Sequence, residues 1–419
     1  MVIAVVVVLT VVFVVLVLNL TTSAKKVKEE LAHLYGTDAP QFVRAIGTML
    51  GPALLGGNRV EALYNGDMIF PAMLSAINGA QRSVTFETYI YWSGRVGREF
   101  ADALSARAKA GVKVHVLIDA VGAATIDKEA FDGMKAAGVE IETFRPVRWY
   151  TLGKLNHRTH RKLLVIDGRI GFTGGVGIAD LWQGNAQDPD HWRDSHFRLE
   201  GPAVGQMQAA FVDHWITARS TVLHGDDYFP KLEPACEQLA QTFRSGSDDG
   251  VESVRLMYLL SLTAATRSIR IANAYFVPDG LTVETLVAAR ERGCTVEVLV
   301  PGRHSDSKLV RKAARARWGP LLEAGVEIHE YRPTMYHCKV MIVDDCWTSV
   351  GSTNFDNRSF RLNEEANLNV MDGEFARAES RQFAIDLTRA TRVTLEAWQR
   401  RPWQEKAMEH LAALLRSQL

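Results

Sequence analysis

Residues 337–344 of the chain read HCKVMIVD, and residues 351–354, shortly after them, read GSTN. The frame H-x-K-x4-D occurs once more, at residues 160–167, where it reads HRKLLVID. In both copies the residues between the lysine and the aspartate are apolar, which predicts a short buried strand with polar residues at its ends. Alternation along a strand places the histidine and the lysine on one face. An imidazole and an ammonium can therefore meet the same anionic group there.

The two copies together predict a site that acts on phosphorus. A histidine can attack phosphorus while a lysine holds the non-bridging oxygens. Because the pKa of histidine is about 6.5, one imidazole can serve as nucleophile and the other as proton donor. We expect no cofactor and no metal, since no cluster of His, Cys and Asp has metal-ligand spacing. The candidate catalytic residues are His160, Lys162, Asp167, His337, Lys339 and Asp344.

The order and spacing of the two motifs resemble those of the phospholipase D superfamily. The flanking stretches narrow the resemblance to the bacterial cardiolipin synthases, over about residues 60–400. These stretches are WRD at residues 192–194, NAYFVP at 273–278, LVPG at 299–302 and GSTNFDNRS at 351–359.

The resemblance implies a transphosphatidylase that moves a phosphatidyl group between phospholipids through a phosphohistidine intermediate. The implied partners are the bilayer and anionic phospholipids, with phosphatidylglycerol as the expected substrate. A phospholipase D that transfers the group to water would use the same site. A nuclease of the same superfamily and a non-catalytic membrane protein are the remaining alternatives.

An internal repeat predicts the fold class. Residues 80–84, 111–114 and 138–141 resemble residues 265–269, 293–296 and 325–328, and each set precedes its own motif. Within each copy, strand-like runs alternate with helix-like segments, which is typical of an α/β fold. With the resemblance, this predicts two tandem phospholipase D-like α/β/α sandwich units, packed with pseudo-twofold symmetry so that the half-sites meet.

We predict the first unit at residues 59–225 and the second at 226–419, joined near residues 220–234. The second unit ends in a helix that begins at Pro402, with Trp403, Leu411 and Leu414 at helical spacing. We expect this helix to pack on the second unit rather than lie on the bilayer.

The chain begins with an uncharged apolar run at residues 2–20. At about 1.5 Å per residue, the run would span roughly 28 Å of bilayer. A cleaved signal peptide is the alternative, but the run is long and no basic residue precedes it. We therefore predict a transmembrane anchor at residues 1–24 and a juxtamembrane linker at 25–58. Lys25, Lys26 and Lys28 follow the run, which favours a single-pass protein of the bacterial inner membrane with its catalytic part in the cytoplasm.

The composition excludes some classes of protein. The 48 basic residues equal the 48 acidic ones, which argues against a protein that depends on non-specific nucleic-acid binding. The four cysteines show no C-x-x-C spacing, so we expect reduced thiols. Cys338 should point away from the site, because it alternates with His337 and Lys339.

Further residues complete the expected site. Asn354 and Ser352 should bind the phosphoryl oxygens, but Gly177 stands where the first copy would carry its asparagine. Each histidine needs a carboxylate on its second nitrogen to fix its tautomer. The candidates are Asp194 and Glu365, each at the head of a predicted strand. The family pattern makes His160 the nucleophile and His337 the acid, and makes Asp167 and Asp344 residues that brace the site without touching substrate. Glu87 remains either a core-edge carboxylate or a site residue.

Overall fold

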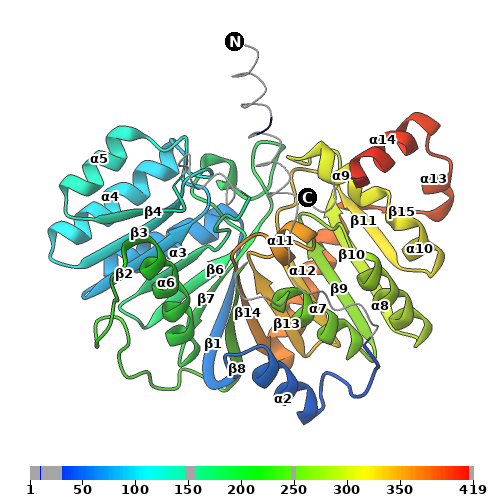
Figure 1. Cartoon of the computed structure of the whole chain (residues 1–419), viewed down its shortest axis with the longest axis horizontal. Helices are drawn as coiled ribbons and strands as arrows, with labels where there is room; N and C mark the ends of the chain where they lie inside the picture. The colour runs from blue at the N-terminus through cyan, green and yellow to red at the C-terminus, as the bar shows by residue number, and fades with distance from the viewer. Residues whose placement is uncertain (1–9, 11–30, 147–155, 247–251, 415–419) are drawn as a thin grey trace.

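The structure is a computed structural model that describes residues 10, 31–146, 156–246 and 252–414. Its strands form one mixed sheet of 15 strands, with helices on both faces (Figure 1). The strands of the first half are β1 Leu55–Tyr64, β2 Ser83–Thr88, β3 Lys113–Asp119, β4 Glu140–Phe144, β5 Leu163–Ile166, β6 Ile170–Gly174 and β7 Ser195–Glu200. Those of the second half are β8 Gln238–Ser245, β9 Ser268–Asn273, β10 Thr295–Pro301, β11 Glu327–Tyr331, β12 Lys339–Val343, β13 Trp347–Gly351, β14 Glu365–Met371 and β15 Ala390–Val393.

The helices of the first half precede or connect these strands. They are α2 Pro40–Met49, α3 Asn65–Gly79, α4 Arg95–Lys109, α5 Lys128–Ala136, the 3-10 turn η2 Asp180–Trp182 and α6 Ala203–Arg219. The second half carries α7 Ser253–Thr263, α8 Gly280–Glu291, α9 Lys308–Arg315, α10 Trp318–Glu323, α11 Asn357–Arg361, α12 Gly373–Leu387, α13 Leu395–Gln399 and α14 Trp403–Leu414.

The strand order is the same on the two sides of the sheet's centre. Outward from β1 it runs β7-β6-β5-β2-β3-β4, and outward from β8 it runs β14-β13-β12-β9-β10-β11, with β15 added at that edge. β1 pairs with β8 in antiparallel fashion, which makes the sheet continuous. The two strands β5 and β12, which follow the histidine motifs, therefore occupy matching places on the two sides of this seam.

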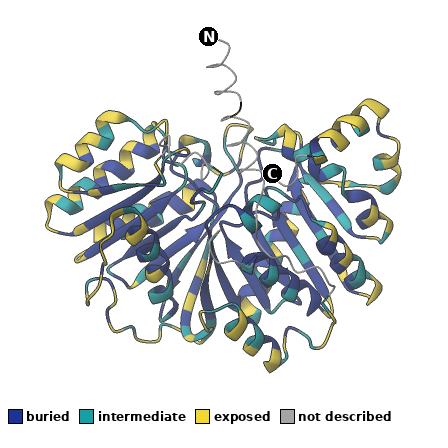
Figure 2. Cartoon of the chain, in the orientation of Figure 1, coloured by how far each residue is buried: buried dark blue, intermediate teal, exposed yellow. Residues whose placement is uncertain are grey.

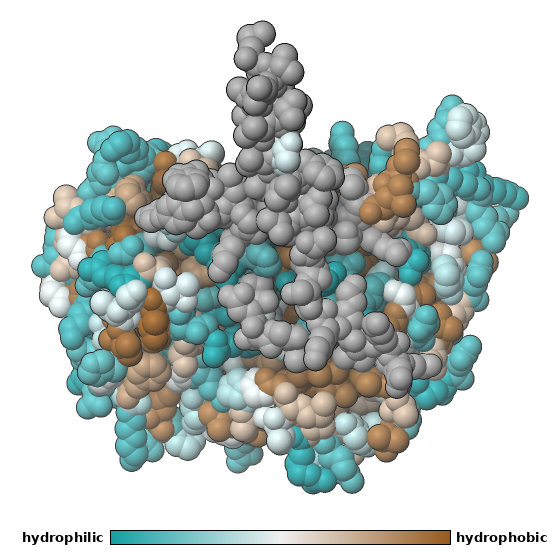
Figure 3. All heavy atoms as spheres, viewed as in Figure 1, coloured by the Kyte–Doolittle hydropathy of each residue, from teal (hydrophilic) through white to brown (hydrophobic). Residues whose placement is uncertain are grey.

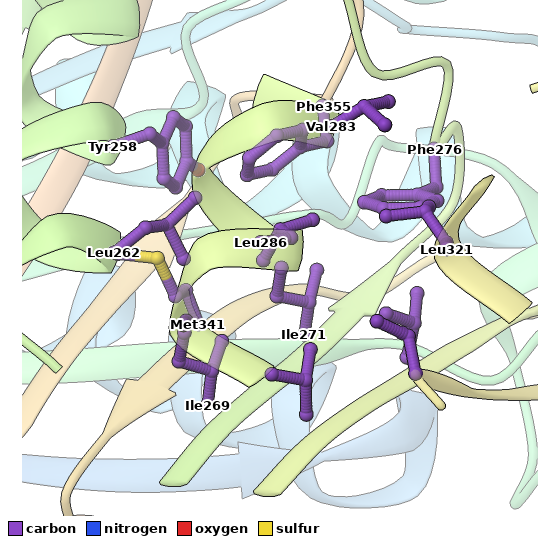
Figure 4. Packing of buried hydrophobic residues seen from close by; sticks show 14 of the residues in the cluster. Tyr258, Leu262, Ile269, Ile271, Phe276, Val283, Leu286, Leu321, Met341 and Phe355 are labelled. Carbon is purple, nitrogen blue, oxygen red and sulfur yellow. The ribbon is translucent and has the colours of Figure 1, made fainter. Parts of the chain in front are cut away.

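The strands β5 and β12 are buried on both faces, as their apolar sequences predict. On one face, Leu164 and Ile166 join the core of the first half. Met341 and Val343 join the core of the second half, where Figure 4 shows Met341 packed among other apolar residues. On the other face, a single cluster takes Leu163 and Val165 together with Val340 and Ile342. Helices α6 and α12 cover this shared cluster. Since each buried aliphatic side chain contributes about 1.5–3 kcal/mol, the shared cluster holds the two halves in one arrangement.

The exposed residues lie mainly on the helices and loops, while most of the sheet is buried (Figure 2). Helix α14 departs from the expectation about its packing. It does pack on α9, but through Glu409 and Ala412, which are buried. The apolar residues that we expected at this contact are instead exposed: Trp403 by 75%, Leu411 by 64% and Leu414 by 76%. Figure 3 shows apolar atoms at the surface in this region.

The predicted anchor at residues 1–24 lies outside the described residues, apart from Thr10. Among the helices that the structure does describe, none is both long enough and apolar enough to cross a bilayer. The described cysteines form no disulfide, and Cys338 is buried with its sulfur beside the hydroxyl of Ser195.

Candidate active site

The two histidines lie at the seam because each motif crosses to the other half of the sheet. The chain before β5 forms a parallel bridge with the chain before β14, and the amide of His160 donates to the carbonyl of Glu364 at 2.8 Å. The chain before β12 makes the same contact with the chain before β7, where the amide of His337 donates to the carbonyl of Arg193 at 2.7 Å. Backbone hydrogen bonds thus place each histidine beside the carboxylate that follows in the opposite half.

The carboxylates are paired crosswise with the histidines. Nδ1 of His160 lies 3.0 and 3.1 Å from the two carboxylate oxygens of Glu365, and Nδ1 of His337 lies 2.7 Å from Oδ2 of Asp194. The sequence indicated these two carboxylates but not which histidine each would contact. A carboxylate on Nδ1 favours the tautomer with its proton there, so Nε2 carries the lone pair that can attack or exchange a proton.

The two lysines lie in the same buried layer as the histidines. Nζ of Lys162 donates to the carbonyl of His160 at 2.8 Å, and Nζ of Lys339 donates to the carbonyl of His337 at 2.5 Å. Nζ of Lys339 is also 3.1 Å from the ring nitrogens of His337. Both lysines are only 3% exposed. Their ammonium groups are therefore held where an anion reaching the histidines would meet them.

Burial shapes the electrostatics of the site. It lowers the pKa of His160 to about 4, although Glu365 acts in the opposite direction, and it lowers the pKa of His337 as well. Burial also lowers the pKa of Lys162 to about 7, with the charge of Lys339 adding to the effect. Both imidazoles are then neutral at pH 7 while no anion is bound. An entering phosphodiester brings one negative charge and favours protonation of one imidazole.

The carboxylates are held differently in the two halves. The hydroxyl of Ser352 donates to Glu365 at 2.5 Å. The residue at the corresponding place in the first copy is Gly175, and the carboxylate of Asp194 occupies the space where its side chain would be. Asp194 accepts instead from the indole nitrogen of Trp182, at 2.9 Å.

The asparagine of the predicted site is present only in the second half. Asn354 lines the cavity, and its Oδ1 is buried without a hydrogen-bond partner among the described residues. At Gly177, its counterpart, a Cβ atom would lie 2.8 Å from Cβ of Ile90. The packing of the first half therefore leaves no room for a second asparagine.

Asp167 and Asp344 lie at the far ends of β5 and β12, away from the histidines. Each has a positive φ, of 53° and 55°, and each accepts hydrogen bonds from three consecutive backbone amides at the start of a neighbouring strand. For Asp344 the donors are the amides of Thr266, Arg267 and Ser268. These aspartates fix the register of the motif strands and do not line the cavity.

Glu87 is a core carboxylate. It is fully buried on β2, accepts from the hydroxyl of Thr159 at 2.5 Å and lies 2.6 Å from Nδ1 of His214. Thr159 points away from the cavity, on the opposite side of the chain from His160. Through Thr159, Glu87 therefore supports the segment that carries His160.

The site opens into a cavity of about 470 Å³. Aromatic side chains to which our sequence reasoning gave no role form much of its wall, and three of them contact histidines. The ring of Tyr89 lies 5.4 Å from that of His160, and the rings of Trp182 and Trp192 each lie 5.4 Å from that of His337. Two arginines were also missed, Arg158 and Arg358. Arg158 could have been found, because it lies two residues before His160 and so shares its face.

Within the described part of the chain, no group of three or more His, Cys, Asp or Glu side chains is arranged to hold a metal ion.

Residues 73–182 and 258–387 match the family described as "Cardiolipin synthase, PLD-like domain". The chain belongs to this family. It is 35% identical over 364 residues to "Cardiolipin synthase 1" of Bacillus anthracis, a match that covers 85% of this chain and 71% of the relative. It is 34% identical over 361 residues to "Major cardiolipin synthase ClsA" of Bacillus subtilis (strain 168), covering 85% of this chain and 75% of the relative.

A solved structure shares the fold of this family member. The crystal structure of the phosphatidylserine synthase of Haemophilus influenzae Rd KW20 matches with a TM-score of 0.70 and 13% identity, over 90% of this chain and 99% of that one. At this identity the match establishes a mixed α/β phospholipase D-like fold and nothing about substrates.

Gly175 provides a direct test of the carboxylate beside His337. In Gly175→Ala, the added Cβ would lie 2.2 Å from Oδ1 of Asp194, so the carboxylate must leave its place. We expect turnover of a phosphodiester substrate to fall about 100-fold or more, because His337 loses its partner. Ser352→Ala is the matched control, since it removes one hydrogen bond to Glu365 and should cost about tenfold or less. Equal effects of the two changes, in variants with wild-type thermal stability, would contradict this account.

Asp344 should matter for stability rather than for chemistry. Asp344→Ala leaves three backbone amides without their acceptor, and we expect the free energy of unfolding to fall by about 3 kcal/mol. Asp344→Asn keeps one acceptor oxygen and tolerates a positive φ, so it should lose less. Urea unfolding measures the loss, and turnover is corrected for the folded fraction. An Asp344→Ala variant of normal stability that cannot turn over substrate would show that this role is wrong.

Proposed function

We propose that this chain is a phosphatidyltransferase of the cardiolipin synthase type, which moves a phosphatidyl group from one phospholipid to a hydroxyl of another. One observation carries the proposal. Two imidazoles from opposite halves, each with Nδ1 on a buried carboxylate, line one cavity together with Lys162, and Lys339 lies buried beside His337. This arrangement suits covalent catalysis on a phosphodiester, with one histidine as nucleophile and the other as acid and base.

In the proposed mechanism, Nε2 of His160 attacks the phosphorus of the donor lipid while His337 protonates the leaving alcohol. The phosphatidyl group is then held on His160. The acceptor hydroxyl gives its proton to His337, its oxygen bonds to phosphorus, and the bond between phosphorus and nitrogen breaks with its electron pair returning to the imidazole. Lys162 and Lys339 stabilise the charge on the non-bridging oxygens in both steps. Asn354 adds a neutral donor, and Ser352 contributes by holding Glu365 in place.

Phospholipids are the substrates that the family relationship supports, with phosphatidylglycerol as the proposed donor and acceptor. The aromatic wall of the cavity supports transfer over hydrolysis, because a covalent intermediate surrounded by Tyr89, Trp92, Trp182 and Trp192 is shielded from water. Hydrolysis by the same site is the alternative. The neutral charge of the chain disfavours a nuclease.

The larger organisation is also part of the proposal. We infer two tandem units, at residues 59–225 and 226–419, related by pseudo-twofold symmetry; the repeated strand order supports this. An anchor at residues 1–24 would hold the catalytic part at the cytoplasmic side of a bacterial inner membrane. The proposed linker at 25–58 would connect them, although its part from α2 onward packs into the folded part of the chain. The apolar run and the lysines after it support that placement.

Product analysis tests the reaction. Given vesicles of phosphatidylglycerol, the purified full-length protein should form cardiolipin and release glycerol, with phosphatidic acid as a minor product, because the dry cavity favours the lipid hydroxyl over water. Thin-layer chromatography of a radiolabelled donor separates the three lipids. Phosphatidic acid as the main product would show that the protein is a hydrolase.

The two histidines should be equally necessary. His160→Ala and His337→Ala should each lower the rate of cardiolipin formation by several orders of magnitude, because neither half-site can supply the missing group within one turnover. His224→Ala, at an exposed position, is the control and should behave as wild type. A variant of either site histidine that kept a tenth of the wild-type rate would rule out the two-histidine mechanism.

The anchor should hold the protein at the membrane and contribute no catalytic group. Removal of residues 1–24 should lower the rate on vesicles and leave the rate on dispersed short-chain phosphatidylglycerol close to that of the full chain. The ratio of the two rates, measured for both proteins in parallel, isolates the membrane effect. An equal loss on both substrates would mean that the segment contributes to the fold or the site.

A further inference from the structure

The cavity contains two arginines that the proposed phosphoryl chemistry does not use. Arg158 and Arg358 line it together with the histidines, although they are 200 residues apart in the chain. Tyr89 connects them to the catalytic groups. Burial raises the pKa of the Tyr89 hydroxyl and the charge of Asp119 adds to this effect, while the charges of Arg358 and Arg158 oppose it. The Tyr89 ring lies 5.4 Å from the ring of His160 and 5.7 Å from Nζ of Lys162.

The guanidinium of Arg158 is fixed in place. Its Nε donates to the carbonyl of His157 at 3.0 Å, and its Nη2 donates to the carbonyl of Arg145 at 3.1 Å. Its Nη1 is buried and has no hydrogen-bond partner among the described residues. The nearest carboxylate, Asp119, is 3.7 Å away and accepts from three backbone amides of its own. Arg158 therefore lines the cavity with its guanidinium at ion-pair distance from Asp119, and its Nη1 lacks a hydrogen-bond acceptor within the described structure.

Arg358 brings a second positive charge to the same wall. It extends from the short helix α11, where its Nη1 donates to the side chain of Asn156 at 3.2 Å, a neutral group. Two carboxylates also line the cavity, and the charge of Arg358 acts on one of them, Asp356. Asp356 accepts from the amide of Ser359 at 2.7 Å, and Asp306 accepts from the hydroxyl of Tyr275 at 2.6 Å.

The two arginines have no counterparts in the repeat, although they come from different halves of the chain. Aligned on the histidines, the counterpart of Arg158 is Met335, and the counterpart of Arg358 is Leu181. The histidines and lysines, by contrast, occur in both halves. Chemistry at a single phosphorus is thus served by the repeated residues, and the two guanidinium groups are additional hydrogen-bond donors in the cavity wall that the repeat does not explain.

We propose that Arg158 and Arg358 bind the phosphate of the acceptor, so that the enzyme selects an alcohol that itself carries a phosphodiester. The inference rests on the proposed phosphatidyl transfer. When the acceptor oxygen attacks, a three-carbon bridge and two ester oxygens separate the acceptor phosphate from the phosphorus under attack. Arg158 lies two residues from His160 on the same face of an extended segment, a separation of about 7 Å along the chain. Guanidinium groups bind phosphate through paired hydrogen bonds, which suits them to this role.

Two soluble acceptors test the assignment without a membrane. With short-chain phosphatidylglycerol as donor, kcat/KM is measured for glycerol and for glycerophosphoglycerol, the deacylated headgroup of phosphatidylglycerol. We expect the wild-type protein to prefer glycerophosphoglycerol. Arg358→Leu and Arg158→Met, which install the residues of the other half-site, should each lower the ratio of the two values about tenfold, while the rate with glycerol falls far less. For Arg358→Lys, the ratio of the two kcat/KM values should lie between that of the wild type and that of Arg358→Leu.

Arg169→Met, at an exposed position on the turn after β5, is the control and should leave both values unchanged. Cardiolipin formation from vesicles should fall in parallel with the rate for glycerophosphoglycerol, which ties the soluble acceptor to the lipid one. A wild-type ratio retained in both arginine variants would overturn this inference and leave phosphatidyl transfer standing. A wild-type protein that uses neither alcohol and only hydrolyses its donor would overturn the proposed function, and this inference with it.

Discussion

The crosswise contact between each histidine and the carboxylate of the other half is the interaction on which the site depends. A phosphodiester held between two imidazoles needs both Nε2 atoms directed at one point. The backbone bridges to Glu364 and Arg193 set that geometry, because they place Glu365 behind His160 and Asp194 behind His337. Neither half contains a complete site by itself. The shared hydrophobic cluster under α6 and α12 and the pairing of β1 with β8 thus serve catalysis as well as stability.

The same arrangement explains how so many charges can be buried. Two lysines and two carboxylates lie within one dry layer, and an isolated charge there would be costly. Burial lowers the pKa of both lysines, and each carboxylate is hydrogen-bonded to a histidine and to at least one further donor. Burial keeps the imidazoles neutral until an anion arrives. The negative charge of a substrate then favours the protonated form of one imidazole, which provides the acid that the first step requires.

The sequence predicted the parts of this structure that depend on local pattern. The strands after His160 and His337, their burial on both faces and the candidate carboxylates all follow from alternation and from the repeat. The crosswise pairing does not, because it depends on contacts between chain segments about 200 residues apart. The exposed face of α14 shows the same limit. Helical spacing identified an apolar stripe at Trp403 and Leu411, yet ion pairs of Arg315 and Arg401 with Glu409 determine which face packs.

The two halves differ at several positions in the cavity wall, and the sequence repeat alone does not predict these differences. Gly177 is not a lost asparagine in a decaying copy, since Ile90 and Trp182 fill the space around it. Trp182 also replaces the serine hydroxyl of the other half as a donor to the carboxylate. The first half thus lacks the serine and the asparagine of the second half and contributes aromatic side chains and Arg158 to the cavity wall, which Arg358 of the second half also lines. In the proposed mechanism the symmetric pair of histidines acts on one phosphorus, and we infer that this asymmetric wall selects the acceptor alcohol.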